Sequence, residues 1–231
     1  MNKMKPKVIV IDGIISAGKT TYISMLLTNL TKKGWKVTVV KEPVDKWKES
    51  GLLQRFYQDP GRWGYHFQTK AFVDRVNENI AMYAAHGTAD TDHHVFILER
   101  SCFTDILFME LLHEAKLVDD MEMANYREWV ALWGKVMPYE PDLFIYLKPT
   151  VEVCMKRLKE RNRVGEEGVS LAYQKSLQEK HDKFFANDYV EISPGHYVSC
   201  IKIMTDENFR DDPAVQEKMT RHFQDILMNF V

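Results

Sequence analysis

The sequence Gly13-Ile14-Ile15-Ser16-Ala17-Gly18-Lys19-Thr20 constrains the fold more than any other part of this chain. It matches the pattern G-x-x-x-x-G-K-[ST], in which the glycines allow the backbone to curl round an anion. The pattern indicates a phosphate-binding loop when it joins a strand to a helix. Here the apolar run Lys7–Asp12 comes before it, and a segment of helical period, Lys19–Lys32, follows it. The sequence therefore predicts a strand, a phosphate-binding loop and a helix, in that order.

Each part of such a loop has a role in holding a nucleotide triphosphate. Backbone N–H groups of the loop and the positive N-terminal end of the helix point at phosphate oxygens. Lys19 is expected to neutralise the charge on the β- and γ-phosphates, and the Thr20 hydroxyl is expected to contact Mg²⁺. We include the next residue, Thr21, in the expected nucleotide-binding set. The loop does not define the reaction, which other residues must decide.

The rest of the chain alternates short apolar runs with longer segments of helical period, which predicts an α/β fold. Runs rich in β-branched and aromatic residues are expected to form five strands: Lys7–Asp12, Lys36–Lys41, His94–Glu99, Leu143–Leu147 and Val198–Met204. Helices are expected at Lys19–Lys32, Gly61–Ala85, Cys102–Ala115, Met121–Val136, Thr150–Glu160, Leu171–Phe185 and Val215–Phe230. Strands that are apolar throughout are buried on both faces. The order thus predicts a five-stranded parallel sheet flanked by helices on both faces.

We expect residues 1–231 to form one domain, because the predicted loops at 86–93, 138–141 and 162–168 do not resemble flexible linkers. The net charge of 31 − 33 = −2 gives no electrostatic reason to bind a nucleic-acid polymer. No window has the roughly 18 consecutive apolar residues of a membrane span, and no signal peptide is visible. The cysteines, Cys102, Cys154 and Cys200, are far apart and lack CxxC spacing, so no disulfide framework or zinc site is expected. These features favour a cytoplasmic protein.

Charged residues follow the second and third predicted strands. Ligands of open α/β sheets bind at the carboxyl ends of the strands, so Glu42 and Glu99 are expected in the same crevice as the phosphate-binding loop. Glu42 could accept the proton of an attacking hydroxyl, although a surface glutamate is the alternative. Glu99 could anchor the nucleotide's metal, and Arg100 could stabilise charge on the transferred phosphoryl group. Trp47 favours a shaped pocket nearby.

Two further clusters lie on predicted helices. Gln68, Ala71 and Arg75 share one face of the helix after Gly61, a pattern that by itself favours a solvated helix surface over a binding site. Arginines at positions 157, 161 and 163 come where another helix ends, just before a glycine-containing loop. Arginines of this kind can clamp a triphosphate, although an exposed basic helix end is the alternative.

Considered together, the blocks GIISAGKTT, KEPVDKW, LLQRFYQDPGRW, FQTKAFVDR, ERSCFTD, RLKERNR and DENF resemble sequences of one enzyme family. The family is that of the cellular and viral deoxynucleoside kinases of the deoxycytidine/deoxyguanosine kinase type. The resemblance runs from about Val8 to Phe209. It implies a P-loop kinase fold with an arginine-rich lid at about 157–168 and a homodimer packed through helices. It also implies transfer of the γ-phosphate of ATP, or of another triphosphate, to the 5′-hydroxyl of a deoxynucleoside with Mg²⁺, in nucleotide salvage.

The resemblance also implies roles for residues of the reaction centre. Glu42 would be the general base on the 5′-hydroxyl, and Arg100 would support both this base and the phosphoryl group. Lys19 would hold phosphate, while Thr20 and Glu99 would bind Mg²⁺ directly or through water.

Other positions correspond to the family's sites for the nucleoside. Tyr57 and Glu166 would bind the sugar 3′-hydroxyl. Trp47 and Phe67 would flank the base, and Gln68 would hydrogen-bond its edge.

A further set corresponds to the donor side of the family's site. Arg161 and Arg163 would close over the phosphates as the lid. Arg157 and the Asn208-Phe209 segment, within a loop at about 205–210, would contact the donor base.

Base preference is expected from Ala71, Arg75 and Asp105. In family members that prefer cytosine and purines, an arginine and an aspartate at the matching positions pair beside the base. The Asp105 carboxylate would accept a hydrogen bond from an exocyclic amino group, whereas it would repel the O4 carbonyl of thymine. Deoxycytidine or a purine deoxynucleoside is therefore predicted over thymidine. Met109, with Phe108 beside it, stands where the family often has a base-stacking phenylalanine.

Two other classes of protein share parts of this pattern. A nucleoside monophosphate kinase of the thymidylate kinase type would have the fold, the phosphate-binding loop and the glutamate-proline pair. It would normally have Asp-Arg in place of Glu99-Arg100. A GTPase-like or other non-kinase nucleotide-binding protein is the second alternative, but the Asn-Lys-x-Asp guanine motif is absent from the sequence.

Overall fold

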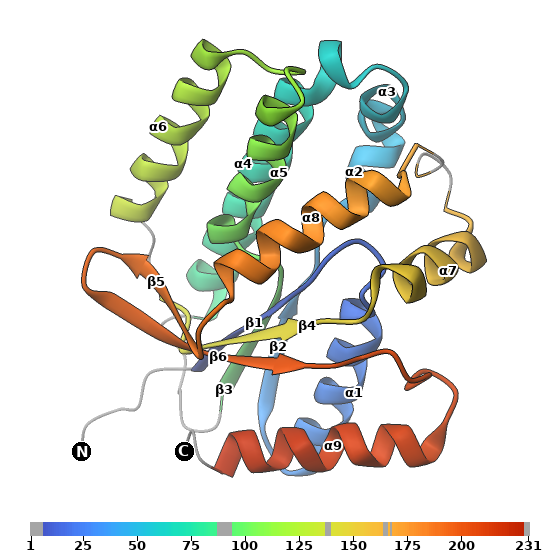
Figure 1. Cartoon of the computed structure of the whole chain (residues 1–231). Helices are drawn as coiled ribbons and strands as arrows, with labels where there is room; N and C mark the ends of the chain where they lie inside the picture. Colours follow the sequence, from blue (N-terminus) through green and yellow to red (C-terminus); the bar gives the residue numbers. More distant parts are fainter. Residues whose placement is uncertain (1–6, 87–93, 137–139, 164–165, 167, 229–231) are drawn as a thin grey trace.

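The computed structural model describes residues 7–86, 94–136, 140–163, 166 and 168–228, with side chains described to residue 221. Its strands are β1 (Lys7–Asp12), β2 (Lys36–Val40), β3 (His94–Glu99), β4 (Leu143–Leu147), β5 (Tyr189–Ser193) and β6 (His196–Ile203). Its helices are α1 (Lys19–Lys32), α2 (Val44–Glu49), α3 (Leu52–Gln58), α4 (Pro60–His86), α5 (Cys102–Glu114), α6 (Asp120–Val136), α7 (Val151–Arg161), α8 (Leu171–Phe184) and α9 (Pro213–Met228). Figure 1 shows a central sheet between layers of helices, so the predicted α/β class is confirmed.

The strands are arranged in the order β2-β3-β1-β4-β6-β5. The first five of these strands are parallel, with β1 in the centre between β3 and β4. Helices cover both faces of β1, so its residues are apolar except at the two ends, Lys7 and Asp12. Parallel pairing places the carboxyl ends of β1, β2 and β3 at one edge of the sheet. The phosphate-binding loop leaves β1 at this edge.

The predicted number of strands was wrong, because the sheet has a sixth strand. This strand, β5, is the outermost strand next to β6 and pairs with it in the antiparallel direction, so the sheet is mixed. In β5 only Val190 is buried, and Tyr189 is half exposed. The short hairpin turns at Gly195, whose φ of 77° is a conformation that glycine adopts readily. A half-exposed edge strand lacks the continuous apolar run by which the buried strands were recognised.

The segment between β2 and α4 also differs from the prediction. It forms the short helices α2 and α3, whereas no helix was expected there. The turn between them contains Gly51 in a left-handed conformation, with a φ of 71°. Helices of six or seven residues are too short for their hydrophobic periodicity to be recognised in a sequence. The other helices lie where they were predicted, with ends that differ by a few residues.

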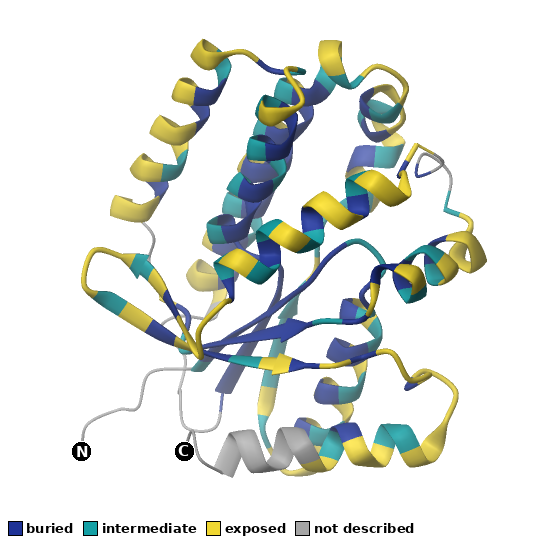
Figure 2. Ribbon diagram, viewed as in Figure 1, coloured by how far each residue is buried: buried dark blue, intermediate teal, exposed yellow. Residues whose placement is uncertain are grey.

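Helices cover the two faces of the sheet in different ways. On one face α1 and α9 lie side by side, and on the other lie α4, α5 and α8, with α6 outside α4 and α5 (Figure 1). Alternate residues of β1 contribute to separate cores, so that Ile9 and Ile11 pack with α1 while Val8 and Val10 pack on the side of α4. Figure 2 shows the buried residues on the strands and on the inner sides of these helices.

A third apolar cluster lies away from the sheet, among α2, α3, α4, α5 and α6. It includes Trp47, Phe56, Phe67, Tyr126 and Trp133. This cluster fixes α2 and α3 over the end of the sheet where the phosphate-binding loop lies.

Two further features of the structure are the state of its cysteines and the apolar character of its helices. All three cysteines are buried and free. Within the described part of the chain, no helix combines the length and the apolar character needed to cross a membrane.

We predict that α1 contributes to stability mainly through its inner face. Leu30 is fully buried against the sheet, whereas Leu27 on the same helix is 39% exposed. Leu30→Ala should lower the free energy of unfolding by about 2–5 kcal/mol, because it removes apolar contacts and leaves a cavity. Leu27→Ala, the matched control, should cost less than about 1 kcal/mol. Urea denaturation measures both values, and equal losses would contradict this assignment of the core.

Candidate active site

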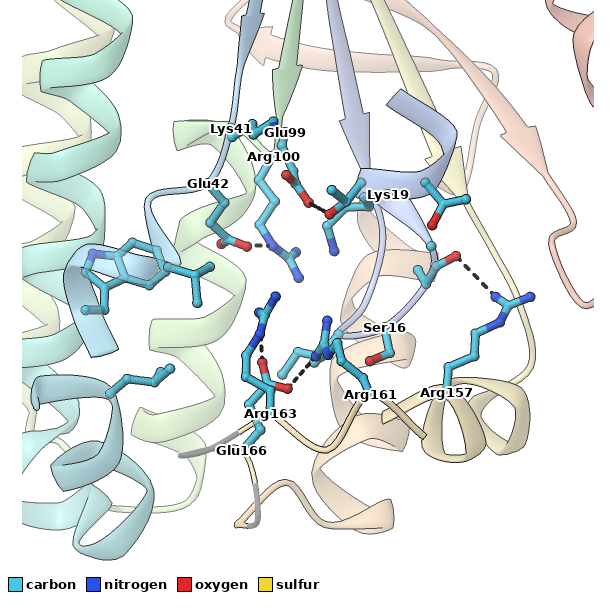
Figure 3. A pocket seen from close by; sticks show the side chains of 18 of the residues that line it. Ser16, Lys19, Lys41, Glu42, Glu99, Arg100, Arg157, Arg161, Arg163 and Glu166 are labelled. Atoms are coloured by element: carbon cyan, nitrogen blue, oxygen red, sulfur yellow. Dashed lines mark hydrogen bonds and ion pairs between the residues drawn. The ribbon is translucent and has the colours of Figure 1, made fainter. Parts of the chain in front are cut away.

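A cavity of about 930 Å³ lies at the edge of the sheet where the parallel strands end. It is lined by residues of the phosphate-binding loop, the ends of β2 and β3, helices α2 to α5, α7 and α8, and the segment 206–211. Every residue predicted for the site lines this cavity except Gly13 and Ile14, which lie in the loop behind it. In Figure 3, Glu42 and Arg100 lie on one side of the open space, and Arg161, Arg163 and Glu166 lie across from them.

The phosphate-binding loop has the backbone that its glycines make possible. Gly13 and Gly18 have φ values of 148° and 98°. A side chain at Gly13 would collide with the backbone oxygen of Leu147, 2.6 Å from the position of its Cβ. Lys19 Nζ donates to the carbonyl oxygens of Gly13 and Ile14, at 3.1 and 3.0 Å. Burial, together with the nearby charge of Arg100, lowers the pKa of Lys19 to about 8.

The two residues predicted to hold a metal lie next to each other. Thr20 Oγ1 donates a hydrogen bond of 2.8 Å to Glu99 Oε1. Within the described residues, no three His, Cys, Asp or Glu side chains gather to form a complete metal site. A hydroxyl and a carboxylate at the mouth of a phosphate-binding loop nevertheless fit Mg²⁺, which is commonly held by one or two protein oxygens together with phosphate and water.

Two buried arginines hold Glu42 in place. Its Oε1 lies 3.3 Å from Arg100 Nε and 3.2 Å from Arg75 Nη2. The Glu42 side chain is 18% exposed, and each arginine side chain is 5% exposed or less. Burial acts to raise the pKa of Glu42, but the charges of Arg100 and Arg75 outweigh it, so the pKa is lowered. Glu42 is therefore an ionised carboxylate at neutral pH that faces the cavity.

Arg75 connects three parts of the site. Its Nε donates to both oxygens of Asp105, at 3.1 and 2.8 Å, and its Nη1 donates to the backbone oxygen of Glu99 at 3.1 Å. Burial raises the pKa of Asp105, although Arg75 acts in the opposite direction. The solvated helix face that was the alternative for Arg75 is excluded, because this residue is 4% exposed and fully engaged.

Aromatic side chains form the wall next to this pair. Phe67 stacks on Phe56, with ring centroids 4.7 Å apart, and Trp47 meets Phe67 edge-on at 5.3 Å. Trp47 Nε1 donates to Asp74 Oδ2 at 2.9 Å, which fixes the indole ring. Gln68 and Ala71, both buried, lie on the same face of α4 as Arg75 and line the cavity. The wall thus combines flat apolar rings with an amide.

Two arginines at or just after the end of α7, Arg161 and Arg163, are bound to Glu166. Arg161 Nη2 contacts one carboxylate oxygen of Glu166, and Arg163 Nη1 donates to the other at 3.2 Å. Tyr57 lies beside this segment, because a side chain at Gly168 would come within 3.1 Å of the Tyr57 Cβ. Burial raises the pKa of Tyr57 well above its usual value, and neighbouring Tyr173 and Glu166 contribute. The predicted lid arginines and sugar-binding residues therefore meet at one side of the cavity.

Arg157 and the segment that follows β6, both predicted to bind the donor, form another side of the cavity. Arg157 Nη2 donates to the backbone oxygens of Thr205 and Glu207, at 2.6 and 3.0 Å, and its guanidinium lies 5.4 Å from the centre of the Phe209 ring. Phe209 is 3% exposed and packs against Gly18, so it closes the phosphate-binding loop from outside. Asn208, predicted with it, lines the cavity.

Several residues of the cavity were not predicted from the sequence as part of the site. Phe108 lines it beneath Arg100, whose guanidinium lies 4.7 Å from the centre of the ring, while Met109 is fully buried and does not line the cavity. Tyr173 reaches it from α8, and Asp12 supports it from behind. Asp12 could have been identified from the sequence, because it is a charged residue at the end of the apolar run KVIVID. No sequence pattern indicates Tyr173.

The fold and the site together define an enzyme that transfers a phosphoryl group from a nucleotide. The phosphate-binding loop provides the donor site, and a held carboxylate faces it across the cavity. The sequence model for deoxynucleoside kinases matches residues 9–228 of this chain, which therefore belongs to the deoxynucleoside kinase family. The resemblance seen in the sequence is thus confirmed.

Individual relatives agree with this assignment. A probable deoxycytidine kinase of fowlpox virus is 35% identical over 96% of this chain and 88% of its own length. Human deoxycytidine kinase is 29% identical, over 89% of this chain and 86% of its own length. The mitochondrial deoxyguanosine kinase of Xenopus laevis is 28% identical, over 94% and 88% respectively. No observation favours the thymidylate-type kinase or the GTPase-like alternative.

We predict that nucleotide binding weakens as the pH rises above about 8. The pKa of Lys19 is about 8 in the free site, and a bound triphosphate favours the charged ammonium. Below this pH the lysine is already charged, whereas above it binding must include the uptake of a proton, and affinity falls. Titration calorimetry of ATP from about pH 7 to about pH 9.5 measures this change. Affinity that stays constant over the whole range would contradict it.

Proposed function

We propose that this enzyme transfers the γ-phosphate of ATP, or of another nucleoside triphosphate, to the 5′-hydroxyl of a deoxynucleoside, with Glu42 as the general base. The observation that carries the proposal is the position of Glu42, which two buried arginines hold at the cavity opposite the phosphate-binding loop. A carboxylate so placed can accept the proton of a hydroxyl that attacks the γ-phosphate. Its lowered pKa keeps it ionised and ready to accept this proton.

The cations around Glu42 would support the transferred group. Arg100 touches Glu42 through Nε and can direct its remaining N–H groups toward a phosphoryl oxygen. Lys19 would exchange its bonds to backbone carbonyls for bonds to phosphate. Arg161 and Arg163 would clamp the triphosphate from the lid, since both line the same cavity. Positive groups on several sides of a phosphoryl group stabilise the charge that develops during transfer.

Thr20 and Glu99 would hold Mg²⁺, directly or through water. When bound, the ion supplies positive charge that is shared between the β- and γ-phosphates. The proposal is supported by the 2.8 Å contact of the two side chains at the mouth of the loop.

The nucleoside would lie between the aromatic wall and the lid. Its base would be flanked by Phe67 and Trp47 and would meet Gln68 at its edge. Its 3′-hydroxyl would bind Tyr57 and Glu166, which are neighbours in the structure. In this arrangement Glu166 would release its arginines to the phosphates when it binds the sugar. The alternative residue for the 3′-hydroxyl, Glu167, lies outside the described residues.

Deoxycytidine, or a purine deoxynucleoside, is the proposed substrate. Asp105 is ion-paired to Arg75 beside Ala71, and its carboxylate lines the cavity. A carboxylate accepts a hydrogen bond from the amino group of cytosine or adenine but opposes the O4 carbonyl of thymine. The names of the relatives, deoxycytidine and deoxyguanosine kinases, support the same preference.

We further propose that the enzyme is a homodimer that packs through α4 and α6. Val73, Ile80 and Tyr83 are exposed along one face of α4, and Trp129 and Leu132 are exposed on α6. These helices lie side by side, so their apolar faces can form one surface (Figure 1). Exposed apolar patches of this kind commonly bind another protein. We also propose, from the sequence alone, that the chain forms a single domain. On the same basis, the enzyme would act in the cytoplasm in nucleotide salvage.

A charge in this surface should separate the subunits. Leu132→Asp would bury an unpaired carboxylate if the face is an interface, so the mass in solution should halve. Leu27→Asp, on the exposed side of α1, is the control and should leave the mass unchanged. Light scattering after gel filtration gives both masses. A Leu132→Asp protein with the mass of the wild type would contradict this interface.

Replacing Glu42 by Gln tests the proposed base. Glutamine preserves the shape of the side chain but accepts no proton, so kcat should fall by about 100-fold or more. The dissociation constant for the nucleoside should change by less than about threefold. Glu49→Gln, at an exposed position of α2, is the matched control. Steady-state kinetics and equilibrium binding measure both quantities, and nearly normal turnover of Glu42→Gln would remove this residue from the mechanism.

A further inference from the structure

Asp12 is a buried carboxylate that the proposed mechanism does not use. It is the last residue of β1, directly before the phosphate-binding loop, and its side chain is fully buried. It does not line the cavity, so it cannot touch a substrate. A charged group in such a position is costly unless the surrounding groups compensate it.

Four groups surround this carboxylate. Oδ1 accepts a hydrogen bond of 2.7 Å from the backbone N–H of Gly13, and Oδ2 accepts one of 2.5 Å from Thr104 Oγ1. Arg100 Nη1 lies 3.4 Å and His181 Nε2 lies 3.5 Å from Oδ1. Burial acts to raise the pKa of Asp12, but His181 and Arg100 outweigh it and hold the pKa well below its usual value. Asp12 therefore carries a negative charge behind the loop.

This charge acts on Arg100, which has an unusual conformation. The backbone φ of Arg100 is 65°, a left-handed value that is uncommon for a residue with a side chain. Its backbone N–H donates to Ile11 on β1 at 2.9 Å, and its guanidinium lies over the Phe108 ring. Asp12 holds Nη1 while Glu42 holds Nε. Two carboxylates on different nitrogens fix both the position and the rotation of a planar guanidinium.

The carboxylate also connects this arginine to α8, the helix that follows the lid. His181 Nδ1 lies 2.8 Å from the carbonyl oxygen of Leu177, and because a carbonyl only accepts, Nδ1 carries the hydrogen. Its Nε2 faces Asp12, 3.5 Å from Oδ1. Two turns earlier, Gln174 Nε2 donates to the carbonyl of Ile15 in the loop at 2.8 Å. The helix α8 therefore contacts the end of β1 through His181 and the phosphate-binding loop through Gln174.

We propose that Asp12 is a positioning residue for phosphoryl transfer, whose negative charge fixes the guanidinium of Arg100 between the phosphate-binding loop and Glu42. The inference rests on the proposed role of Arg100 and adds to it a group that acts from behind the site. Neither the hydrogen bond to Gly13 nor the one to Thr104 requires a charge, because a neutral amide could make both. A neutral amide oxygen could also accept from Arg100 Nη1, but the ionic attraction to the guanidinium requires the charge, so the two functions of Asp12 can be separated.

Asp12→Asn is the variant that separates them. Asparagine can accept from Gly13 through Oδ1 and can place its amide against Thr104, but it leaves Arg100 without its second carboxylate. We expect kcat to fall about 10- to 100-fold, because Arg100 is no longer fixed where charge develops. The KM for the deoxynucleoside should change by less than about threefold. Asp142→Asn is the matched control, because Asp142 binds the backbone of Val8 at the other end of β1.

A double-mutant cycle with Arg100→Ala distinguishes positioning from a general loss of structure. Rates of product formation from radiolabelled ATP are compared for the wild type, both single variants and the double variant. Asp12→Asn should have less than about a twofold effect on kcat once Arg100 is absent. An equal loss in both backgrounds, or no loss in the wild-type background, would overturn the proposal. Normal activity of Arg100→Ala alone would instead overturn the proposed role of Arg100.

A second variant keeps the test decisive if Asp12→Asn does not fold. Thr104→Val keeps the charge of Asp12 but removes the hydroxyl that holds its Oδ2. The carboxylate can then rotate, so kcat should fall about 2- to 10-fold, and again only when Arg100 is present. Circular dichroism establishes that each variant is folded. An unchanged kcat of folded Thr104→Val would overturn the proposal in this case.

Discussion

The pairing of buried charges at the ends of the parallel strands is the constraint on which this active site depends. Removing a charge from water is favourable only when opposite charges and hydrogen bonds surround it. Arg75 and Arg100 satisfy this condition with three carboxylates, Glu42, Asp105 and Asp12. Each arginine contacts two of them, so the network links β1, the end of β2, α4 and α5. If one member is lost, the charges of its partners are left unpaired in a buried site. The mutual pairing therefore holds these side chains in fixed positions.

Under the proposed function, the same architecture separates the donor and acceptor sides of the cavity. The phosphate-binding loop, α7 and the segment after β6 form the donor side, where Arg157 ties loop and segment together through backbone oxygens. The cluster of α2 to α6 forms the acceptor side, where Phe67 and Arg75 lie on one helix. Glu42 and Arg100 stand between the two sides. In the proposed reaction a transferred phosphoryl group would pass between these two residues.

Much of the fold and the site could be predicted from the sequence, for physical reasons. Strands buried on both faces have continuous apolar runs, and the carboxyl ends of parallel strands meet at one edge, which brings Glu42 and Glu99 together. The strand β5 could not be predicted in this way, because it is exposed on one face and only Val190 is buried. The support of Arg100 by Asp12 and Phe108 depends on tertiary packing that no local pattern records.

We propose that this member of the deoxynucleoside kinase family phosphorylates an amino-bearing deoxynucleoside whose base contacts Asp105. The most direct test is an ADP-release assay with ATP and Mg²⁺, in which deoxycytidine, deoxyadenosine, deoxyguanosine, thymidine and dTMP are offered in parallel. We predict that deoxycytidine or a purine deoxynucleoside has the highest kcat/KM, because Asp105, paired with Arg75, would accept a hydrogen bond from its amino group. A highest value for thymidine would contradict the role given to this pair, and turnover with dTMP alone would contradict the assigned acceptor.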